Sequence, residues 1–407
     1  MIDINKFDFE PIAKKYSTPL YIYDADRIRA NIKRIKDAFE KYYPKTEMHY
    51  SVKANNNIHI LKIFKEAGLG TDCSSPLEVK LSRMAGFDEK DILYTGNYES
   101  SEDIKAIFNN DICINLDDIE SFRKMIKIGT PDRISFRINP GIGRGGHEGI
   151  TTAGADAKFG VPYEKAYDAY KEAYDAGIRR FGIHMMTGSN NLEPYYFAEI
   201  TDKLMNIAGR LFNKLGCSPE YVDIGGGYGI PYEDDEEPLN VDMTAKLIAE
   251  ALKEKCVKYN LPEPVLKLEP GRYFVADAGY LLTRVISVKK SYKNFAGVDA
   301  GMNTLIRPAL YGSKHRSFVN GKDDNMGFIN VCGRICENSD IFGQNMFLPE
   351  LEDGDLIVMR DVGAYGYVMA SSYNGRLKPA EVLIDANKSR LIRRRETDED
   401  FLTLLEE

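Results

Sequence analysis

Tryptophan is absent from the 407 residues, and no apolar run approaches the ~20 residues that a membrane-spanning helix requires. The six cysteines contain neither a CxxC pair nor a Cys/His spacing suited to zinc, so we expect no metal site. Their scatter is typical of reduced thiols in the cytosol. The acidic, mixed N-terminal sequence MIDINKFDFE is not that of a signal peptide. We therefore expect a cytoplasmic protein without a membrane partner.

Positive charge is also in short supply. The chain carries 54 Lys and Arg against 62 Asp and Glu, which gives a formal net charge of -8. This balance argues against nucleic acid as a partner, although local Arg clusters and backbone N–H groups can still bind small anions. Apolar residues (43%) and charged residues (29%) occur in the proportions of a globular protein, and the length predicts two or three domains.

Short apolar runs alternate with amphipathic stretches over the first two-thirds of the chain. Eight runs have the length and composition of strands: 49–52, 70–73, 92–95, 111–114, 133–138, 181–186, 221–224 and 265–269. All but the last precede a helical pattern, which predicts a parallel sheet closed into a (β/α)8 barrel over residues 24–278. A doubly wound open sheet fits the same count. Polar residues cluster after several strands, and this favours the barrel because barrel enzymes keep their chemistry there.

Helical periodicity is scarce beyond residue 279. Strand-like runs separated by turn residues occur instead at 280–289, 295–299, 328–332, 355–361 and 381–384. They predict a second, mainly antiparallel β domain. The run Tyr21-Ile22-Tyr23 precedes the first barrel helix. We therefore assign residues 1–23 to this domain together with residues 279–407.

The sequence YSVKAN places Lys53 at the end of an apolar strand, and Asp72 ends the next one. A lysine normally lies in water on a solvated face. Lys53 instead follows a run that looks buried, and burial disfavours the charged form of an amine. The neutral amine is the form that reacts with an aldehyde to make a Schiff base. Lys53 is therefore a candidate nucleophile.

A glycine run, DIGGGYG, follows the seventh predicted strand. Without Cβ atoms, Gly225, Gly226 and Gly227 can bring backbone N–H groups close to a phosphate. A tight turn and a dinucleotide fingerprint are the alternatives, but GGGYG fails the GxGxxG spacing. The run favours a phosphate cradle of another type.

The segment EPGR ends the eighth predicted strand and has two interpretations. Glu269 is either an ion-pair partner of Arg272 or a carboxylate that points inward at a heterocyclic nitrogen. In the second case the N–H of Gly271 and the guanidinium of Arg272 would bind an anion.

Two loops carry further candidates. His184 is either a satisfied core histidine or a catalytic group, and Ser189 in the same loop is placed to donate to a phosphate. A lone cysteine is usually a small buried hydrophobe. Cys336, however, stands next to Glu337 among polar residues, and an exposed thiol beside a carboxylate suits proton donation.

Short Gly- and Pro-bounded loops hold Arg307, Tyr311 and Tyr365. Arginine binds carboxylates well because its planar fork can reach both oxygens. Arg and Tyr are also common on surfaces, so these residues become candidates only in combination with the others.

Nine motifs, in order along nearly the whole chain, resemble those of the barrel-type (fold type III) pyridoxal phosphate decarboxylases. They are YSVKAN (50–55), NPGIGRG (139–145), AKFGV (157–161), HMMTGS (184–189), DIGGGYG (223–229), EPGR (269–272), RPALYGS (307–313), CENSD (336–340) and GAYG (363–366). The resemblance implies a carbon–carbon lyase of lysine biosynthesis. Its expected reaction converts meso-2,6-diaminopimelate to L-lysine and CO2 with pyridoxal 5'-phosphate as cofactor.

The resemblance also implies a role for each candidate. Lys53 resembles the catalytic lysine that holds the cofactor, and Glu269 resembles the partner of its pyridine nitrogen. The other implied cofactor-binding residues are Asp72, His184, Ser189, Gly225, Gly226, Gly227, Gly271, Arg272 and Tyr365. The implied substrate-binding residues are Arg272, Arg307, Tyr311, Glu337 and Tyr365. Cys336 resembles a catalytic thiol supplied by a neighbouring subunit, which implies a homodimer whose β domains complete shared active sites.

Departures from the family pattern bear on the substrate. The family loop usually reads His-x-His-x-Gly-Ser with the second His stacked on the cofactor ring, but Met186 stands there, and CENSD replaces the common CESGD. Decarboxylation of ornithine, lysine or carboxynorspermidine is therefore an alternative. A barrel-type racemase is less favoured, because racemases face the ring nitrogen with an arginine where Glu269 stands. A non-catalytic cofactor carrier would have only a barrel domain.

Overall fold

The chain folds into two compact units. The computed structural model describes residues 7–108, 111–141 and 152–405. The first unit, called the barrel unit here, comprises residues 29–231 and 237–273. The second, called the β unit, comprises the residues up to 28, residues 232–236 and the residues from 274 onward. The domain boundaries expected at residues 24 and 278 remain a prediction.

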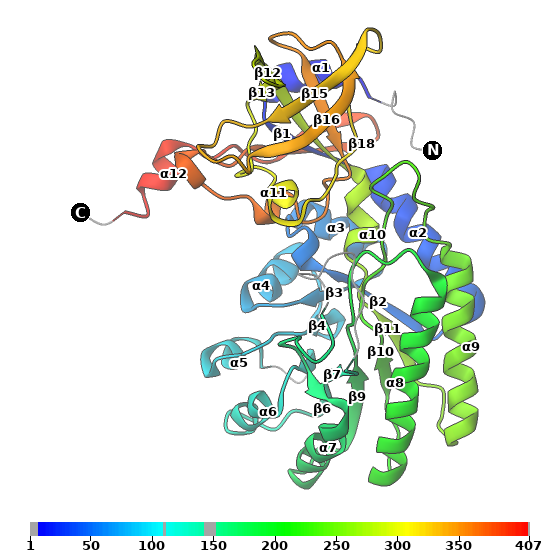
Figure 1. Cartoon of the computed structure of the whole chain (residues 1–407). Helices are drawn as coiled ribbons and strands as arrows, with labels where there is room; N and C mark the ends of the chain where they lie inside the picture. Colours follow the sequence, from blue (N-terminus) through cyan, green and yellow to red (C-terminus); the bar gives the residue numbers. More distant parts are fainter. Residues whose placement is uncertain (1–6, 109–110, 142–151, 406–407) are drawn as a thin grey trace. The chain divides into compact units, whose positions relative to one another are not determined.

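The barrel unit contains eight strands that close on themselves (Figure 1). In order around the barrel they are β10 (Tyr221–Asp223), β11 (Val265–Leu268), β2 (Thr46–Ser51), β3 (Gly70–Cys73), β4 (Ile92–Tyr94), β5 (Cys113–Leu116), β6 (Arg133–Phe136) and β9 (Arg180–His184). Every neighbouring pair is parallel. The predicted barrel is confirmed, the open sheet is excluded, and each of the eight predicted runs overlaps one of these strands.

Helices surround the barrel strands in Figure 1. They are α2 (Ala25–Tyr42), α3 (Ile58–Glu66), α4 (Pro76–Ala85), α5 (Ser101–Ile107), α6 (Ile119–Ile126), α7 (Ala166–Asp175), α8 (Pro194–Leu215) and α9 (Val241–Tyr259), with the short α10 (Arg272–Val275) after the last strand. Helix α4 shows how the sequence sets their ends. The side chain of Ser75 accepts from the N–H of Glu78, Pro76 occupies the first turn, and Gly86 ends the helix at φ 95°.

The β unit is built on a nine-stranded sheet. Its main path is β16 (Ile341–Pro349), β15 (Met326–Cys332), β13 (Asn294–Val298), β12 (Gly279–Lys290), β1 (Leu20–Asp24), β18 (Ala380–Asp385) and β19 (Lys388–Arg393), with β17 (Leu356–Arg360) and β14 (Ser317–Val319) attached through β12. Most pairs are antiparallel, and β1–β18 and β13–β15 are parallel. The mainly antiparallel domain is confirmed.

Strand β1 joins this sheet as the Tyr21-Ile22-Tyr23 run predicted, because it pairs with both β12 and β18. Three strands of the sheet, β14, β16 and β19, were not expected from the sequence. The described part of the unit also contains the short α-helices α1 (Phe9–Tyr16), α11 (Arg307–Tyr311) and α12 (Asp398–Leu402). A two-stranded pair, β7 (Ile138–Asn139) with β8 (Val161–Pro162), belongs to the barrel unit. Within the described ranges, none of the helices is long and apolar enough to cross a membrane.

Gly182 tests the packing of the barrel interior. It lies opposite Tyr221 in the β9–β10 pair, and a Cβ atom added there would stand 2.0 Å from the Tyr221 ring. We expect Gly182→Ala to lower the free energy of unfolding by about 1–3 kcal/mol, the usual cost of overpacking. Gly327→Ala, in a strand where nothing lies within 4 Å of the added atom, is the matched control. Equal melting temperatures for the two variants would contradict the expectation.

Candidate active site

Lys53 stands at the carboxyl end of β2, in the single turn Val52–Ala54 that follows the strand. Its Nζ donates to Asp72 Oδ2 at 2.6 Å, and the Asp72 side chain is fully buried while that of Lys53 is 40% exposed. Ser51 Oγ lies 2.9 Å from the same Asp72 oxygen. Burial raises the pKa of Asp72, and the charge of Glu269 adds to the rise, while Lys53 and Ser51 oppose it. The pair therefore holds an amine at the open end of the barrel.

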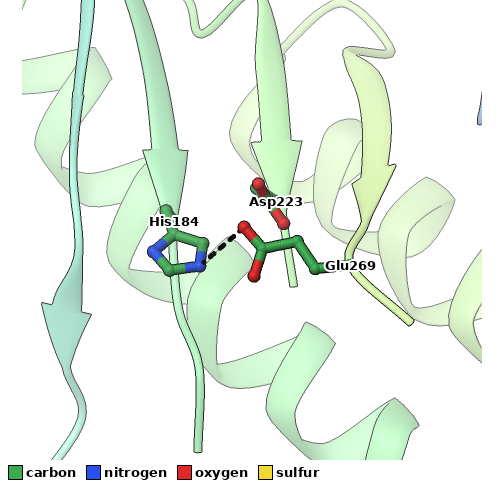
Figure 2. Close-up of side chains that lie close together, drawn as sticks. All are labelled: His184, Asp223 and Glu269. Atoms are coloured by element: carbon green, nitrogen blue, oxygen red, sulfur yellow. Dashed lines mark ion pairs between the residues drawn. The ribbon is translucent and has the colours of Figure 1, made fainter. Parts of the chain in front are cut away.

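Three buried ionisable side chains lie close together at neighbouring strand ends of the barrel (Figure 2). His184 is the last residue of β9, Asp223 is the last of β10, and Glu269 directly follows β11. His184 Nε2 lies 3.4 Å from Glu269 Oε1, and one ligand-type atom from each residue lies within 4.8 Å of the others. This spacing would also suit a metal ion, so the expectation of no metal site remains a prediction.

The pKa values of the three groups are shifted in different directions. Burial by itself would raise the pKa of Glu269, but His184, Lys53 and a hydrogen bond from Asp223 lower it to about 2. Burial raises the pKa of Asp223 to about 8, and the charge of Glu269 adds to that rise. Burial would lower the pKa of His184, but the neighbouring carboxyls, Glu269 first and Asp223 second, outweigh burial and raise this pKa above 6.5. At neutral pH the cluster thus contains a charged Glu269 and a neutral Asp223, beside a His184 whose pKa is raised.

A polar ladder supports the cluster from across the barrel. Tyr221 OH donates to Asn115 Oδ1 at 3.1 Å, and Asn115 Nδ2 lies 3.2 Å from Thr95 Oγ1 and 3.4 Å from Asp223 Oδ2. Thr95 Oγ1 in turn lies 3.5 Å from Glu269 Oε1. None of the ladder residues was a sequence candidate. A single Thr, Asn or Tyr in a strand gives no signal of its own, because barrel closure alone brings the three together.

The glycine turn packs tightly against two other strand ends. Cβ atoms added at Gly225, Gly226 and Gly227 would stand 2.8, 2.4 and 2.9 Å from the carbonyl oxygens of Met185, Glu269 and Gly188. Gly225 and Gly227 also have positive φ values, 72° and 95°, which favour glycine. The turn is thus a tight turn, as one interpretation had it, and the N–H groups of Gly225 and Gly226 donate to Asp223 Oδ1 and Met186 Sδ. The phosphate cradle remains a prediction.

Met186 lies over this turn, at the position where the family pattern has a second His. Its Sδ accepts from the N–H of Gly226 at 3.3 Å. Its main-chain O accepts from Arg137 Nη2 at 3.3 Å, and that guanidinium also donates to the O of Thr152 at 3.1 Å. Arg137 is buried and was not a sequence candidate, since an Arg inside a strand-like run reads as a surface residue. Within the NPGIGRG motif, residues 142–145 lie outside the described residues.

Arg272 and Ser189 meet beside the turn. Arg272 is buried, and its Nη2 donates to Ser189 Oγ at 3.2 Å. Gly271, the residue before it, is so close to β2 that an added Cβ would stand 2.9 Å from Ser51 Cβ. The Glu269 carboxylate contacts His184 and Thr95 in the structure, whereas the EPGR ion-pair interpretation paired it with Arg272.

The remaining candidates belong to the β unit and are described there alone. Arg307 is buried in α11, with its guanidinium 5.5 and 5.8 Å from the rings of Tyr232 and Tyr311. Its Nη2 donates to Ser313 Oγ at 3.3 Å. The aromatic faces and this hydrogen bond fix the direction of the guanidinium.

The loop that contains Cys336 is open to solvent. Cys336 is exposed, and its main-chain N–H donates to Asn374 Oδ1 at 2.7 Å. Glu337 is the next residue, and its Oε1 accepts from Ser339 Oγ at 2.5 Å. Tyr365 stands in a left-handed backbone conformation, with φ 57°. The β unit therefore presents a thiol, a carboxylate, a phenol and a fixed guanidinium.

The charge state of His184 can be measured directly. Replacing both neighbouring carboxyls, in Glu269→Gln with Asp223→Asn, leaves burial as the main influence on the ring. We expect the pKa of His184 to fall from above 6.5 in the wild type to below that value in the double variant. NMR titration of protein with labelled histidine, assigned with His184→Asn, measures it. An unchanged pKa would contradict this account of the cluster.

Comparisons with known proteins agree with this site. Residues 26–276 match the family model described as pyridoxal-dependent decarboxylase, pyridoxal binding domain. The chain is 43% identical to diaminopimelate decarboxylase of Methanothermobacter thermautotrophicus, with 97% of this chain and 93% of the relative aligned. It is also 43% identical to the enzyme of the same name from Thermoplasma acidophilum, over 98% of this chain and 96% of the relative.

Solved structures give the same result. The crystal structure of diaminopimelate decarboxylase from Helicobacter pylori complexed with L-lysine matches with a TM-score of 0.90 and 34% identity, and the match covers 97% of this chain and 98% of that one. The corresponding Methanocaldococcus jannaschii structure matches with a TM-score of 0.88 at 33% identity. The implied cofactor class is thereby confirmed. The chain belongs to the pyridoxal-dependent decarboxylases, in the diaminopimelate decarboxylase family.

Proposed function

We propose that this chain converts meso-2,6-diaminopimelate to L-lysine and CO2 with pyridoxal 5'-phosphate held in the barrel unit. One observation carries the proposal: an amine fixed by Asp72 and an ionised, buried Glu269 face the same end of one barrel. An amine is required to hold an aldehyde cofactor, and an acid is required at its ring nitrogen. Full-length similarity to curated diaminopimelate decarboxylases supports the substrate.

The residues present fit the cofactor. Lys53 would hold its aldehyde carbon, and Glu269, whose pKa of about 2 keeps it charged, would keep the proton on the pyridine nitrogen. The glycine turn follows β10, whose carboxyl end lies with those of β2 and β11 at one end of the barrel, and a backbone without Cβ atoms can approach a phosphate closely. The proposed phosphate-binding residues are Ser189, Gly225, Gly226, Gly227, Gly271, Arg272 and Tyr365.

The other side chains are proposed to orient the reacting groups and to hold or donate protons. The bound cofactor supplies an electron sink for the electron pair that departing CO2 leaves on the substrate. Asp72 keeps Lys53 in place, and His184 keeps Glu269 charged. A proton must then replace the lost carboxyl at the same carbon. The Nζ of Lys53 and the thiol of Cys336 are the proposed donors.

The β unit offers the groups that diaminopimelate needs at its far end. That end carries both an amino group and a carboxylate, whereas ornithine, arginine and lysine have no distal carboxylate. The positioned guanidinium of Arg307 suits the carboxylate, and Glu337 suits the amino group. Arg272, Tyr311 and Tyr365 are proposed to complete the substrate site. Cys336 is proposed to act in the site of a second copy, in a homodimer.

The substrate assignment is tested with purified protein, pyridoxal phosphate and meso-diaminopimelate, with lysine and CO2 both followed. We expect equal amounts of the two products. Ornithine, lysine and carboxynorspermidine are offered in parallel. Turnover of one of these without turnover of diaminopimelate would overturn the assignment, and racemised starting acid without CO2 release would indicate a racemase.

Lys53→Ala tests the proposed attachment of the cofactor. We expect this substitution to abolish activity and to remove the absorbance band that the cofactor acquires on attachment to an amine. Lys65→Ala, a lysine of the same unit that pairs with Asp91 at 3.2 Å, is the matched control. A Lys53→Ala protein that keeps both the band and the activity would remove Lys53 from the mechanism.

Mixing variants tests the proposed sharing of sites. Alone, Cys336→Ala should bind cofactor normally but lower kcat by roughly 100-fold, the lower end of what a general acid contributes. In a dimer of Lys53→Ala with Cys336→Ala, one site carries both substitutions and the other carries neither. The mixture should therefore be more active than the sum of its parts after subunit exchange. Strictly additive activity would argue against shared sites.

A further inference from the structure

Two carboxyl groups lie side by side at the floor of the barrel site. Asp223 ends β10 and Glu269 follows β11, the neighbouring strand, and both side chains are buried. One oxygen of each carboxyl lies within 4.8 Å of one of the other. Two negative charges so close together in a buried site repel strongly, so one carboxyl of such a pair keeps a proton. Which carboxyl holds the proton decides what the cofactor ring would meet.

The contacts place the proton on Asp223. Glu269 Oε1 faces His184 Nε2 at 3.4 Å, and His184 is the first of the groups that lower the pKa of Glu269 against burial. The two oxygens of Asp223 differ from each other. Oδ1 accepts from the N–H of Gly225 at 2.9 Å, whereas Oδ2 has only a long contact, 3.4 Å, with Asn115 Nδ2. A protonated acid has this pattern, because its carbonyl oxygen accepts better than its hydroxyl oxygen.

The ladder behind Asp223 fixes the direction of these contacts. Tyr221 is fully buried, which raises the pKa of its hydroxyl well above 10, so the hydroxyl keeps its proton and donates to Asn115 Oδ1. That bond turns the amide NH2 of Asn115 toward Asp223. Asn115 therefore cannot accept the proton of Asp223. Glu269, the neighbouring carboxyl with an oxygen within 4.8 Å of one of Asp223, is the acceptor that we infer.

We propose that Asp223 is a positioning residue that stays protonated and donates a hydrogen bond to Glu269, which keeps Glu269 charged and aimed at the ring nitrogen of the cofactor. The inference rests on the proposed cofactor site and concerns a residue outside the family roles implied by the sequence motifs. The charged groups that act on Asp223 are Glu269, which raises its pKa, and His184 and Lys267, which lower it. Burial and the neighbouring Glu269 outweigh the two bases, so the neutral form of Asp223 is favoured at neutral pH.

The proposal predicts how cofactor binding depends on pH. Because burial and Glu269 raise the pKa of Asp223 to about 8, Asp223 is protonated below that pH and ionised above it. Ionisation replaces the hydrogen bond by repulsion of Glu269. The affinity for pyridoxal phosphate should therefore fall above pH 8 in the wild type.

Asp223→Asn and Asp223→Ala separate the proposed role from a merely structural one. Asn resembles a neutral carboxylic acid and can donate to Glu269, whereas Ala cannot. We expect Asp223→Asn to bind pyridoxal phosphate within about threefold of the wild type and to lose the fall in affinity above pH 8. Asp223→Ala should bind roughly 10- to 100-fold more weakly, the loss expected for a hydrogen bond to a buried charge. Asp202→Asn, an exposed carboxyl on α8, is the matched control.

Cofactor affinity and absorbance are the readouts, so the result does not depend on which substrate the enzyme accepts. The proposal is overturned if folded Asp223→Asn binds cofactor as weakly as Asp223→Ala, because Asp223 would then act as an anion. Persistence of the alkaline fall in Asp223→Asn would overturn it as well. If Asp223→Ala does not fold, infrared difference spectra of wild type against Asp223→Asn at neutral pH decide. A protonated-acid carbonyl band that is missing from the wild type would refute the proposal.

Discussion

The charge on Glu269 is the constraint from which the rest of the site can be understood. A carboxylate buried at the floor of a barrel is unfavourable unless opposite charge and hydrogen-bond donors surround it. His184 lies 3.4 Å from Oε1 of Glu269 and lowers the pKa of Glu269, and Thr95 contacts the same oxygen. With this support the group stays ionised at neutral pH, and a proton on a neighbouring ring nitrogen is then stabilised. The electron sink of the proposed reaction depends on that proton.

Barrel closure makes this arrangement available. The supporting residues come from strands that lie far apart in the sequence, from β4 and β5 on one side to β9, β10 and β11 on the other. Each of these strands contributes one polar residue near its carboxyl end, and the parallel order brings all of those ends to one mouth. The second pair, Lys53 with Asp72, comes from β2 and β3, the adjoining part of the same ring. The amine that would hold the cofactor and the carboxylate that would face its ring nitrogen are therefore positioned by the same barrel.

Much of the fold could be predicted because its signals are local. Eight short apolar runs with helical stretches between them specify a barrel without knowledge of any long-range contact. Strands β16 and β19 were not predicted because the strand pattern in their sequences is weak. Strand β16, IFGQNMFLP, carries Gly, Gln and Asn and pairs through shifted registers. Strand β19, KSRLIR, ends the sheet path beside β18, and half of its residues are charged. Residues that pair at irregular or edge positions do not alternate cleanly between apolar and polar.

The residues of the site also divide into those with a local sequence signal and those without one. Lys53, the glycine turn and Glu269 stand in motifs at strand ends, so the sequence alone indicates them. Asn115 and Tyr221 act through neighbours about 106 to 108 positions away, and no pattern along the chain shows such a contact. Arg137 is hidden for a similar reason, since its partners are main-chain oxygens of residues 152 and 186. Side chains that support a reacting group indirectly are recognised only once the fold is known.

The two-unit division has a consequence for divergence within such a family. The amine, its carboxylate partner and the three-membered acid–imidazole cluster all belong to the barrel unit. Mutations in loops of the β unit can therefore accumulate without disturbing the balance of charges on which cofactor chemistry relies. A lineage with this architecture can change its amino acid substrate while the charged groups of the barrel unit stay the same.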